Sequence, residues 1–431
     1  MELPLPSFFE SPTVAQLAAL VESTPAERVD RAPPPPEPSP TEESVHRYRL
    51  SPDQSRLWYL QQLDPESPAY HIPLTYRLKG RVDEAALQEA LDALVRRHDA
   101  LRITIDGSGD EPVQVVHAPA PVSIRHTDLP LATPETRIRE LLREEATAPF
   151  DLERGPLLRV RWLQRGEEEH HLVVTLHHLV ADGWSASLMA REISRDYARA
   201  LDARTGGGDG DPDTPSIDRD SAIHEPERWG PWCAEQRAWL ESPECREELA
   251  FWSDRLADVQ PLELPADHLR PDRPSYRGRT HGFRLPLDAT ERLEGRCREA
   301  GITPFAGLLG GFKALLHRYA GQTDLAVGTV VAGRTSRASE EMLGLFANTV
   351  VVRTDIDPEG PVESLLVEVA RNSIEALGHQ RAPFGAVVEA VQPPRDPSRN
   401  PLFQAAFLLQ NQDTAPVELP GTQSSAVTVE T

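Results

Sequence analysis

Residues 170–185 read His-His-Leu-Val-Val-Thr-Leu-His-His-Leu-Val-Ala-Asp-Gly-Trp-Ser, and this stretch decides the fold class. Its apolar run is typical of a buried strand, and the Asp-Gly pair that follows is typical of a turn. His177 and His178 stand at the end of the predicted strand. Because consecutive strand side chains point to opposite faces, only one of these histidines can face a given cavity. The other packs against the opposite layer or bonds to backbone.

The polar residues at this strand end fit acid–base chemistry. Histidine has the unperturbed pKa nearest neutrality, so His178 suits a general base. Asp182 could orient the imidazole directly or fix the turn through an arginine, and Gly183 permits a positive φ and offers its N–H as an oxyanion donor. Two alternatives stay open on the residues alone. The histidines could be hydrogen-bonded core residues, and a zinc site is the weaker reading because no helical histidine pair or nearby cysteine is present. We therefore predict no metal.

Beyond this stretch the chain alternates helix and strand patterns. Apolar side chains recur at helical spacing on Leu87, Leu91, Leu94 and Val95, and again on Phe305, Leu308, Leu309 and Phe312. Short β-rich runs lie at Leu158–Leu163, Leu172–Leu176, Leu325–Val331 and Val350–Val352. A polar stretch, Thr205–Asp220, indicates either a break between two lobes or a long surface loop.

The chain of 431 residues is strongly acidic, since 45 Lys and Arg against 68 Asp and Glu give a net charge of −23. That field repels phosphate, so we expect neither a nucleic-acid partner nor an anionic membrane. The sequence has no run of about 18 apolar residues, and its N-terminus lacks the basic and apolar regions of a secretory signal. We expect a cytoplasmic protein.

The motif His177–Gly183, HHLVADG, matches the HHxxxDG motif of the condensation domains of nonribosomal peptide synthetases. Other segments resemble further motifs of this family, in the family's order: Ser51–Leu60 (SPDQSRLWYL), Arg97–Arg102 (RHDALR), Leu343–Thr349 (LGLFANT) and Arg395–Leu402 (RDPSRNPL). Motifs in a fixed order are far more specific than any one of them. The resemblance covers nearly the whole chain after residue 46.

The resemblance implies an α/β fold of α+β two-layer sandwiches. Two lobes similar to chloramphenicol acetyltransferase would form a V-shaped pseudo-dimer with a central tunnel. We expect the N-terminal lobe at residues 47–217 and the C-terminal lobe at 218–431, apparently truncated at its end. Residues 1–24 resemble the last helix of a peptidyl carrier (thiolation) domain, and the proline-rich residues 25–46 favour an extended linker.

The resemblance also implies an acyltransferase that forms an amide (peptide) bond. A donor acyl or peptidyl thioester on an upstream carrier domain would be attacked by the amine of an aminoacyl thioester on a downstream carrier domain. No cofactor would be bound directly, because the substrates are carried on the phosphopantetheine arms of these partners. An adjacent adenylation domain is expected in the full synthetase.

By the same resemblance His178 is the catalytic histidine, acting as a general base or by positioning the amine. Gly183, Asp182 and His177 complete the catalytic motif. Asp182 is expected to hold the motif by a salt bridge, with Arg102 as its partner and Arg97 as the alternative. The substrate tunnel is expected to be lined by Asn348, Trp184 and Ser185, although Trp184 is more typical of packing.

Two other functions stay open. The first is a catalytically silent, condensation-like scaffold that recruits carriers or tailoring enzymes. The second is an acyltransferase of the same superfamily that works without carriers. The intact motif favours an enzyme, whereas the sequence does not name the substrates or the product.

Overall fold

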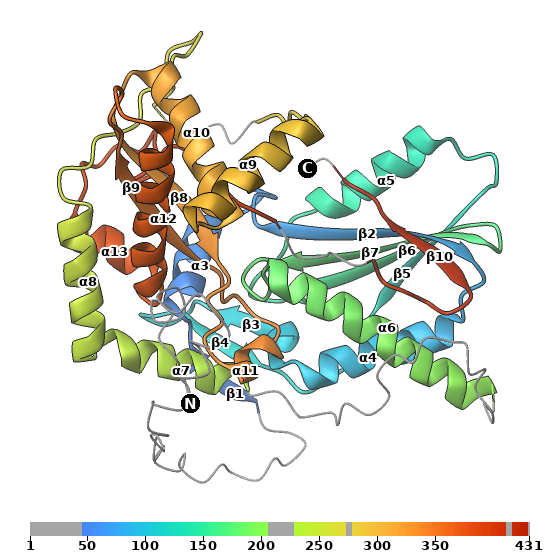
Figure 1. The fold of residues 1–431 in the computed structure, drawn as a ribbon. Coiled ribbons are helices and arrows are strands. Elements are labelled where there is room, and N and C mark those ends of the chain that lie inside the picture. The colour runs from blue at the N-terminus through green and yellow to red at the C-terminus, as the bar shows by residue number, and fades with distance from the viewer. Residues whose placement is uncertain (1–44, 206–227, 273–277, 411–415, 430–431) are drawn as a thin grey trace, which may run out of the picture. The chain divides into compact units, whose positions relative to one another are not determined.

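The computed structural model describes residues 45–205, 228–272, 278–410 and 416–429 (Figure 1). They form two compact units. The N-terminal unit holds the described residues of Pro40–Trp239, Arg334–Ala347 and Gln412–Thr431, and the C-terminal unit holds those of Leu240–Gly333 and Asn348–Asn411. We expected each lobe to be continuous in sequence. Instead, two later segments, Arg334–Ala347 and Gln412–Thr431, belong to the N-terminal unit. The carrier helix, most of the linker and the boundary at residues 217 and 218 lie outside the described residues.

The N-terminal unit is built on a five-stranded sheet with the strand order β10-β2-β7-β6-β5. Its strands are β2 (His71–Gly80), β5 (Ile124–Leu129), β6 (Leu158–Arg165), β7 (Glu169–His177) and β10 (Thr422–Ala426). A three-stranded sheet of order β1-β4-β3 contains β1 (His46–Arg49), β3 (Ile103–Asp106) and β4 (Val113–Val116). The helices are α3 (Pro52–Leu63), α4 (Glu84–Arg97), η1 (Asp99–Arg102), α5 (Glu135–Thr147), α6 (Gly183–Thr205), α7 (Trp229–Leu240) and α11 (Arg337–Glu340).

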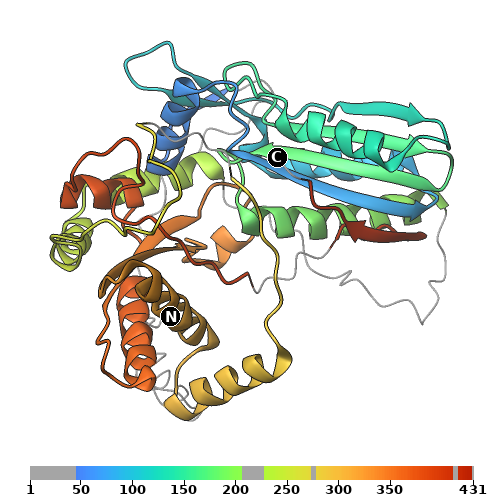
Figure 2. The same ribbon diagram turned by 90° about the horizontal axis from the view of Figure 1, so that it is seen from above.

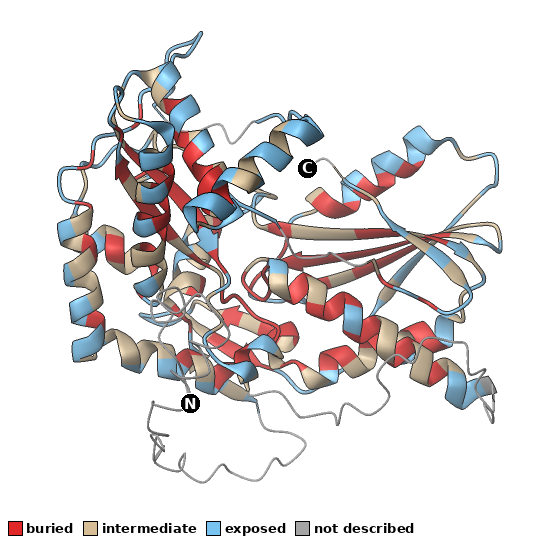
Figure 3. Cartoon of the chain, viewed as in Figure 1, coloured by how far each residue is buried: buried red, intermediate tan, exposed pale blue. Residues whose placement is uncertain are grey.

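Helices cover both faces of the five-stranded sheet (Figure 2). Leu172, Val174 and Leu176 of β7 join the main core together with α4 and α6, whereas Val173 packs with apolar residues of α5. This alternation along β7 is the period of two that strand geometry imposes. Nearly every residue of β7 is buried, because helices cover both faces of the sheet (Figure 3), and the predicted apolar face of α4 is buried in the same core. Fully burying each such side chain contributes about 1.5–3 kcal/mol.

The C-terminal unit contains an antiparallel pair of strands, β8 (Asp324–Val331) and β9 (Asn348–Asp355). Its helices are α8 (Pro243–Arg255), α9 (Leu287–Ala300), α10 (Pro304–Ala320), α12 (Val362–Gly378) and α13 (Phe384–Val391). The predicted helix and strand segments are confirmed in both units, so the mixed α/β class is confirmed. None of the described helices combines the length and the apolar character needed to cross a bilayer.

Candidate active site

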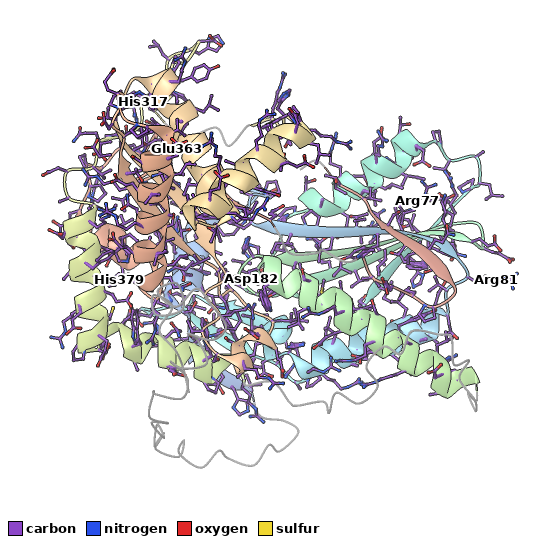
Figure 4. The ribbon with its side chains drawn as sticks, viewed as in Figure 1. Arg77, Arg81, Asp182, His317, Glu363 and His379 are labelled. Carbon is purple, nitrogen blue, oxygen red and sulfur yellow. The ribbon has the colours of Figure 1, made fainter. Side chains whose placement is uncertain are left out.

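The HHxxxDG segment forms the connection from β7 to α6. β7 ends at His177, and α6 begins at Gly183. Asp182 caps this helix: its Oδ1 accepts a hydrogen bond from the N–H of Ser185 at 2.8 Å, and its carbonyl accepts the first intrahelical bond, from Ala186 at 3.0 Å. Figure 4 shows Asp182 at the start of α6, at the opposite end of the sheet from Arg81. The turn is thus fixed between a central strand and a capped helix.

His177 is a structural residue of this turn. Its side chain is fully buried, Nδ1 accepts a hydrogen bond from the N–H of Leu179 at 3.1 Å, and Nε2 lies 3.4 Å from Oε1 of Gln61. Burial, helped by the nearby His71 and His178, lowers the pKa of His177 to about 3. The imidazole is therefore neutral, with its proton on Nε2, and it is unsuited to catalysis at neutral pH.

His178 differs from its neighbour. It lies just beyond the strand, its side chain is half-buried, and its backbone N–H donates to the carbonyl of Tyr70 at 2.7 Å. Its Nδ1 has no hydrogen-bond partner among the residues that the structure describes. This Nδ1 is shielded from solvent, so only the accessible part of the half-buried ring can exchange a hydrogen bond or a proton with a substrate.

Asp182 is buried and surrounded by donors. Besides Ser185, its carboxylate accepts from the guanidinium of Arg334, with Nη2 3.0 Å from Oδ1, and from the backbone N–H groups of Phe346 at 3.0 Å and Ala347 at 3.2 Å. Its side chain is almost fully shielded from solvent. Asp182 is therefore a buried counter-charge that ties the LGLFANT segment to the motif.

The partner of Asp182 is Arg334, so our prediction of Arg102 is wrong. Arg102 instead donates from Nε to the carbonyl of Val95 at 3.0 Å and forms an ion pair with Asp99 in η1. Its alternative, Arg97, binds Glu192 and Asp196 of α6. The partner of Arg102 is three residues away in the sequence, whereas Arg334 follows β8 and reaches Asp182 only through the fold. Arg334 itself also donates from Nη1 to the carbonyl of Met342 at 2.7 Å.

Ser185 and Trp184 serve the same network. The hydroxyl of Ser185 lies 2.8 Å from Oδ1 of Asp182 and 2.9 Å from the carbonyl of Gly344, and this serine is buried. The indole N–H of Trp184 donates to the carbonyl of Glu340 at 2.9 Å. Gly344 is required here, because a Cβ at this position would lie 2.1 Å from the ring of Trp229. Both side chains are therefore held by hydrogen bonds within the N-terminal unit, and the tunnel lining that we expected of them stays a prediction.

Gly183 is exposed, and its backbone is helical, so it does not use the positive φ that glycine permits. A Cβ added there would meet no atom within 4 Å. Neither backbone conformation nor crowding in the described structure therefore requires glycine. As the first residue of α6, its N–H belongs to the first turn, where donors have no intrahelical partner.

Asn348 lies in the C-terminal unit, at the start of β9, and is buried. Its Nδ2 donates to the carbonyls of Gln380 at 2.8 Å and Ala382 at 2.7 Å. Its Oδ1 accepts from the N–H groups of Thr349 at 2.8 Å and Phe384 at 3.1 Å. Every polar group of this amide is used within the unit, so the geometry points to a brace for the loop before α13.

Sequence reasoning missed the glutamines that support the turn. Gln54, in the SPDQSRLWYL segment, is fully buried; its amide donates to the carbonyl of Leu179 at 3.1 Å, and it completes a capping box with Ser51. Gln61, two turns later on α3, faces His177. The spacing of these residues on one helix was the only available signal. No cluster of potential metal ligands occurs in the described ranges.

Comparisons with known proteins identify a family that this chain resembles over most of its length. A family model described as "Condensation domain" matches residues 44–430. The chain is 39% identical to chondramide synthase of Chondromyces crocatus over 380 residues and 36% identical to phosphinothricin tripeptide synthetase of Streptomyces viridochromogenes over 423 residues. These matches cover 87% and 97% of the chain, but only 9% and 34% of the two relatives.

A solved structure with the same fold is the X-domain from teicoplanin biosynthesis. It is 28% identical with a TM-score of 0.76, and the match covers 91% of this chain and 85% of the X-domain. The X-domain has also been solved in complex with OxyB, again with a TM-score of 0.76.

Proposed function

The chain belongs to the condensation domain family of nonribosomal peptide synthetases, and from this we propose that it forms a peptide bond between two carrier-bound substrates. The donor would be an acyl or peptidyl thioester on an upstream carrier domain, and the acceptor an aminoacyl thioester on a downstream one. Both would arrive on phosphopantetheine arms, in a cytoplasmic synthetase that also contains an adenylation domain.

The observation that carries the proposal is the difference in burial and hydrogen bonding between the two histidines of the motif. His177 is buried, neutral and bonded on both ring nitrogens, whereas the ring of His178 is only half-buried, although its Nδ1 is shielded and has no partner among the described residues. The side chains of Asp182 and Ser185 are engaged in hydrogen bonds with Arg334. Within the motif, His178 is therefore the side chain that can meet an amine.

In the proposed reaction the acceptor nitrogen attacks the thioester carbon. The C–N bond forms, the C–S bond breaks, and the donor carrier leaves as a thiol. One proton leaves the nitrogen, and His178 either takes this proton or orients the amine by a hydrogen bond. The exposed N–H of Gly183 would stabilise the oxyanion of the tetrahedral intermediate, and the missing side chain would let the thioester approach.

The test is peptide formation between loaded upstream and downstream carriers, followed by mass spectrometry of the tethered products. We expect dipeptide from the wild-type chain and a loss of at least roughly 100-fold in rate for His178→Ala, in line with general acid–base contributions. His126→Ala, at an exposed histidine on β5, is the matched control. Wild-type yield from His178→Ala would remove the assignment.

A second function, a scaffold that recruits a tailoring enzyme, is favoured by one observation: the likeness to the X-domain, whose structure with OxyB is known. The intact His178 and Gly183 argue for catalysis. No product from the wild-type chain with several matched donors, together with binding of a partner enzyme, would favour the scaffold. Turnover of a soluble acyl thioester and amine without any carrier would support the third reading, a carrier-independent acyltransferase.

A further inference from the structure

A cavity lies in the N-terminal unit, and no residue of the HHxxxDG turn lines it. Its volume is about 620 Å³, within the range of small-molecule sites. It is bounded by the η1–β3 connection, the segment between β4 and β5, the end of α5 and the start of β6. The pairing of β5 with β6 starts at Val160, so the cavity lies where β6 has not yet met its neighbour.

The floor of this cavity is apolar and preformed. It is made by buried side chains from four elements of the unit: Val95, Leu101, Ile103, Leu158 and Val160. These side chains also belong to the main core, so their positions are fixed by packing. A slim apolar ligand that covers these side chains would bind favourably, because burial of apolar surface lowers the free energy.

The rim is cationic, although the chain carries a net charge of −23. Four arginines line the cavity against a single acid, Glu145. Two of them are already paired: Arg102 with Asp99, and Arg159 with Glu145 at 2.9 Å. The other two, Arg125 and Arg154, are free to meet a ligand.

Arg125 and Arg154 are both exposed at the mouth of the cavity. Arg154 reaches Asp151 only at 3.8 Å, with a side chain that is 88% exposed. Arg125 has no hydrogen bond or ion pair with the described residues, and it lies in register with another arginine, Arg161. An anion at this point would offset the repulsion between like charges.

We propose that this cavity binds an anionic acyl compound, with its unbranched chain on the apolar floor and its carboxylate or phosphate at Arg125 and Arg154. Guanidinium groups bind both anions through paired N–H donors. The site is distinct from the condensation chemistry, because neither its floor nor its rim includes a residue of the motif. Its occupancy therefore does not depend on whether the proposed reaction takes place.

The experiment is calorimetric titration of the purified 431-residue chain with octanoate, octyl phosphate and octanol. We expect saturable binding of at least one anion and at least tenfold weaker binding of octanol. Comparison of the two anions tells a carboxylate source from a phosphate source. The variant Arg125→Glu should weaken anion binding at least tenfold, and Ala120→Trp, which fills the exposed mouth, should do the same.

Arg139→Glu is the matched control, since Arg139 is exposed on α5 and does not line the cavity. Its affinity should stay within twofold of the wild type. All three substitutions are at exposed positions, and circular dichroism checks that the variants are folded. Absence of saturable binding by either anion, equal binding of octanol, or equal effects of Arg125→Glu and Arg139→Glu would overturn the proposal.

Discussion

The guanidinium of Arg334 lies 3.0 Å from the carboxylate of Asp182, although 152 residues separate them in the sequence. Both side chains are almost fully buried, at 1% and 2% exposure. The pair joins the turn after β7 to the segment that contains α11. It explains why a segment that follows β8 of the C-terminal unit returns to the N-terminal unit. The carboxylate also receives two backbone N–H groups from Phe346 and Ala347, so the charge is neutralised and hydrogen-bonded at once.

Removal of this pair should unfold the chain at lower denaturant. Arg334→Met leaves a buried carboxylate without its counter-charge, and breaking such a pair costs about 3–5 kcal/mol. We expect a large fall in the urea midpoint, measured by tryptophan fluorescence. Arg204→Met, which breaks an exposed pair with Asp83, should change the midpoint little. Equal midpoints for the two variants would contradict the structural role of Arg334.

Glycine at position 183 should matter for activity and not for stability. Because a Cβ there meets nothing and the backbone is helical, Gly183→Ala should leave the urea midpoint unchanged or slightly raised. We expect its rate of peptide formation to fall at least roughly tenfold, since the side chain would obstruct the proposed approach of the thioester to the N–H. Gly385→Ala, at an equally open glycine near the start of α13, is the control. A fully active Gly183→Ala would remove the proposed oxyanion role.

Substitution of Asn348 tests whether its side chain is a structural brace or a substrate contact. Asn348→Ala leaves two carbonyls and two N–H groups without their side-chain partner, at about 1–3 kcal/mol for each group that stays buried and unpaired. We therefore expect a strong loss of stability, read by urea unfolding. Asn348→Asp should also be destabilised, because a carboxylate would face the carbonyls of Gln380 and Ala382. A stable Asn348→Ala variant with impaired peptide formation would instead restore the expected tunnel role.

The sequence predicted the central architecture because β7 and α4 carry their own periodicity. The apolar run before His177 results from burial on both faces of β7, and the helical spacing from Leu87 to Val95 results from burial on one face of α4, and local pattern records both. The partner of Asp182 could not be found this way. A salt bridge across 152 residues depends on how the chain returns, and the resemblance that suggested Arg102 does not record that return. Likewise, the two histidines His177 and His178 can be told apart only when the hydrogen-bond partners and the burial of each ring are known.

His177 should make folding sensitive to mild acid. Its pKa is lowered from 6.5 to about 3 in the folded state by burial. Between these values the unfolded chain binds more protons than the folded one, so stability falls as pH falls below about 6.5. His177→Gln removes one titrating group and should reduce this slope by roughly 1 kcal/mol per pH unit at most. Urea unfolding at pH 6.5, 5.5 and 4.5 measures it, with His126→Gln as the exposed control. Identical slopes for wild type and His177→Gln would contradict the buried, neutral imidazole.

Lys313, in the C-terminal unit, should make the stability of the chain depend on pH above neutrality. It is fully buried in α10, where its ammonium donates to the carbonyl of Val352 at 2.7 Å and to Oγ1 of Thr354 at 2.8 Å. Burial lowers its pKa from 10.5 to about 7. Above pH 7 the unfolded chain therefore holds a proton that the folded chain releases, so this residue should make stability rise from pH 7 to 8.5. Lys313→Met lacks this titrating group. As the pH rises, the urea midpoint of the wild type should therefore increase relative to that of the variant. Buried thiols such as Cys233 titrate alike in both proteins and cancel in that difference. A difference that stays constant over this window would mean that the ammonium keeps its proton when folded, held by its acceptors.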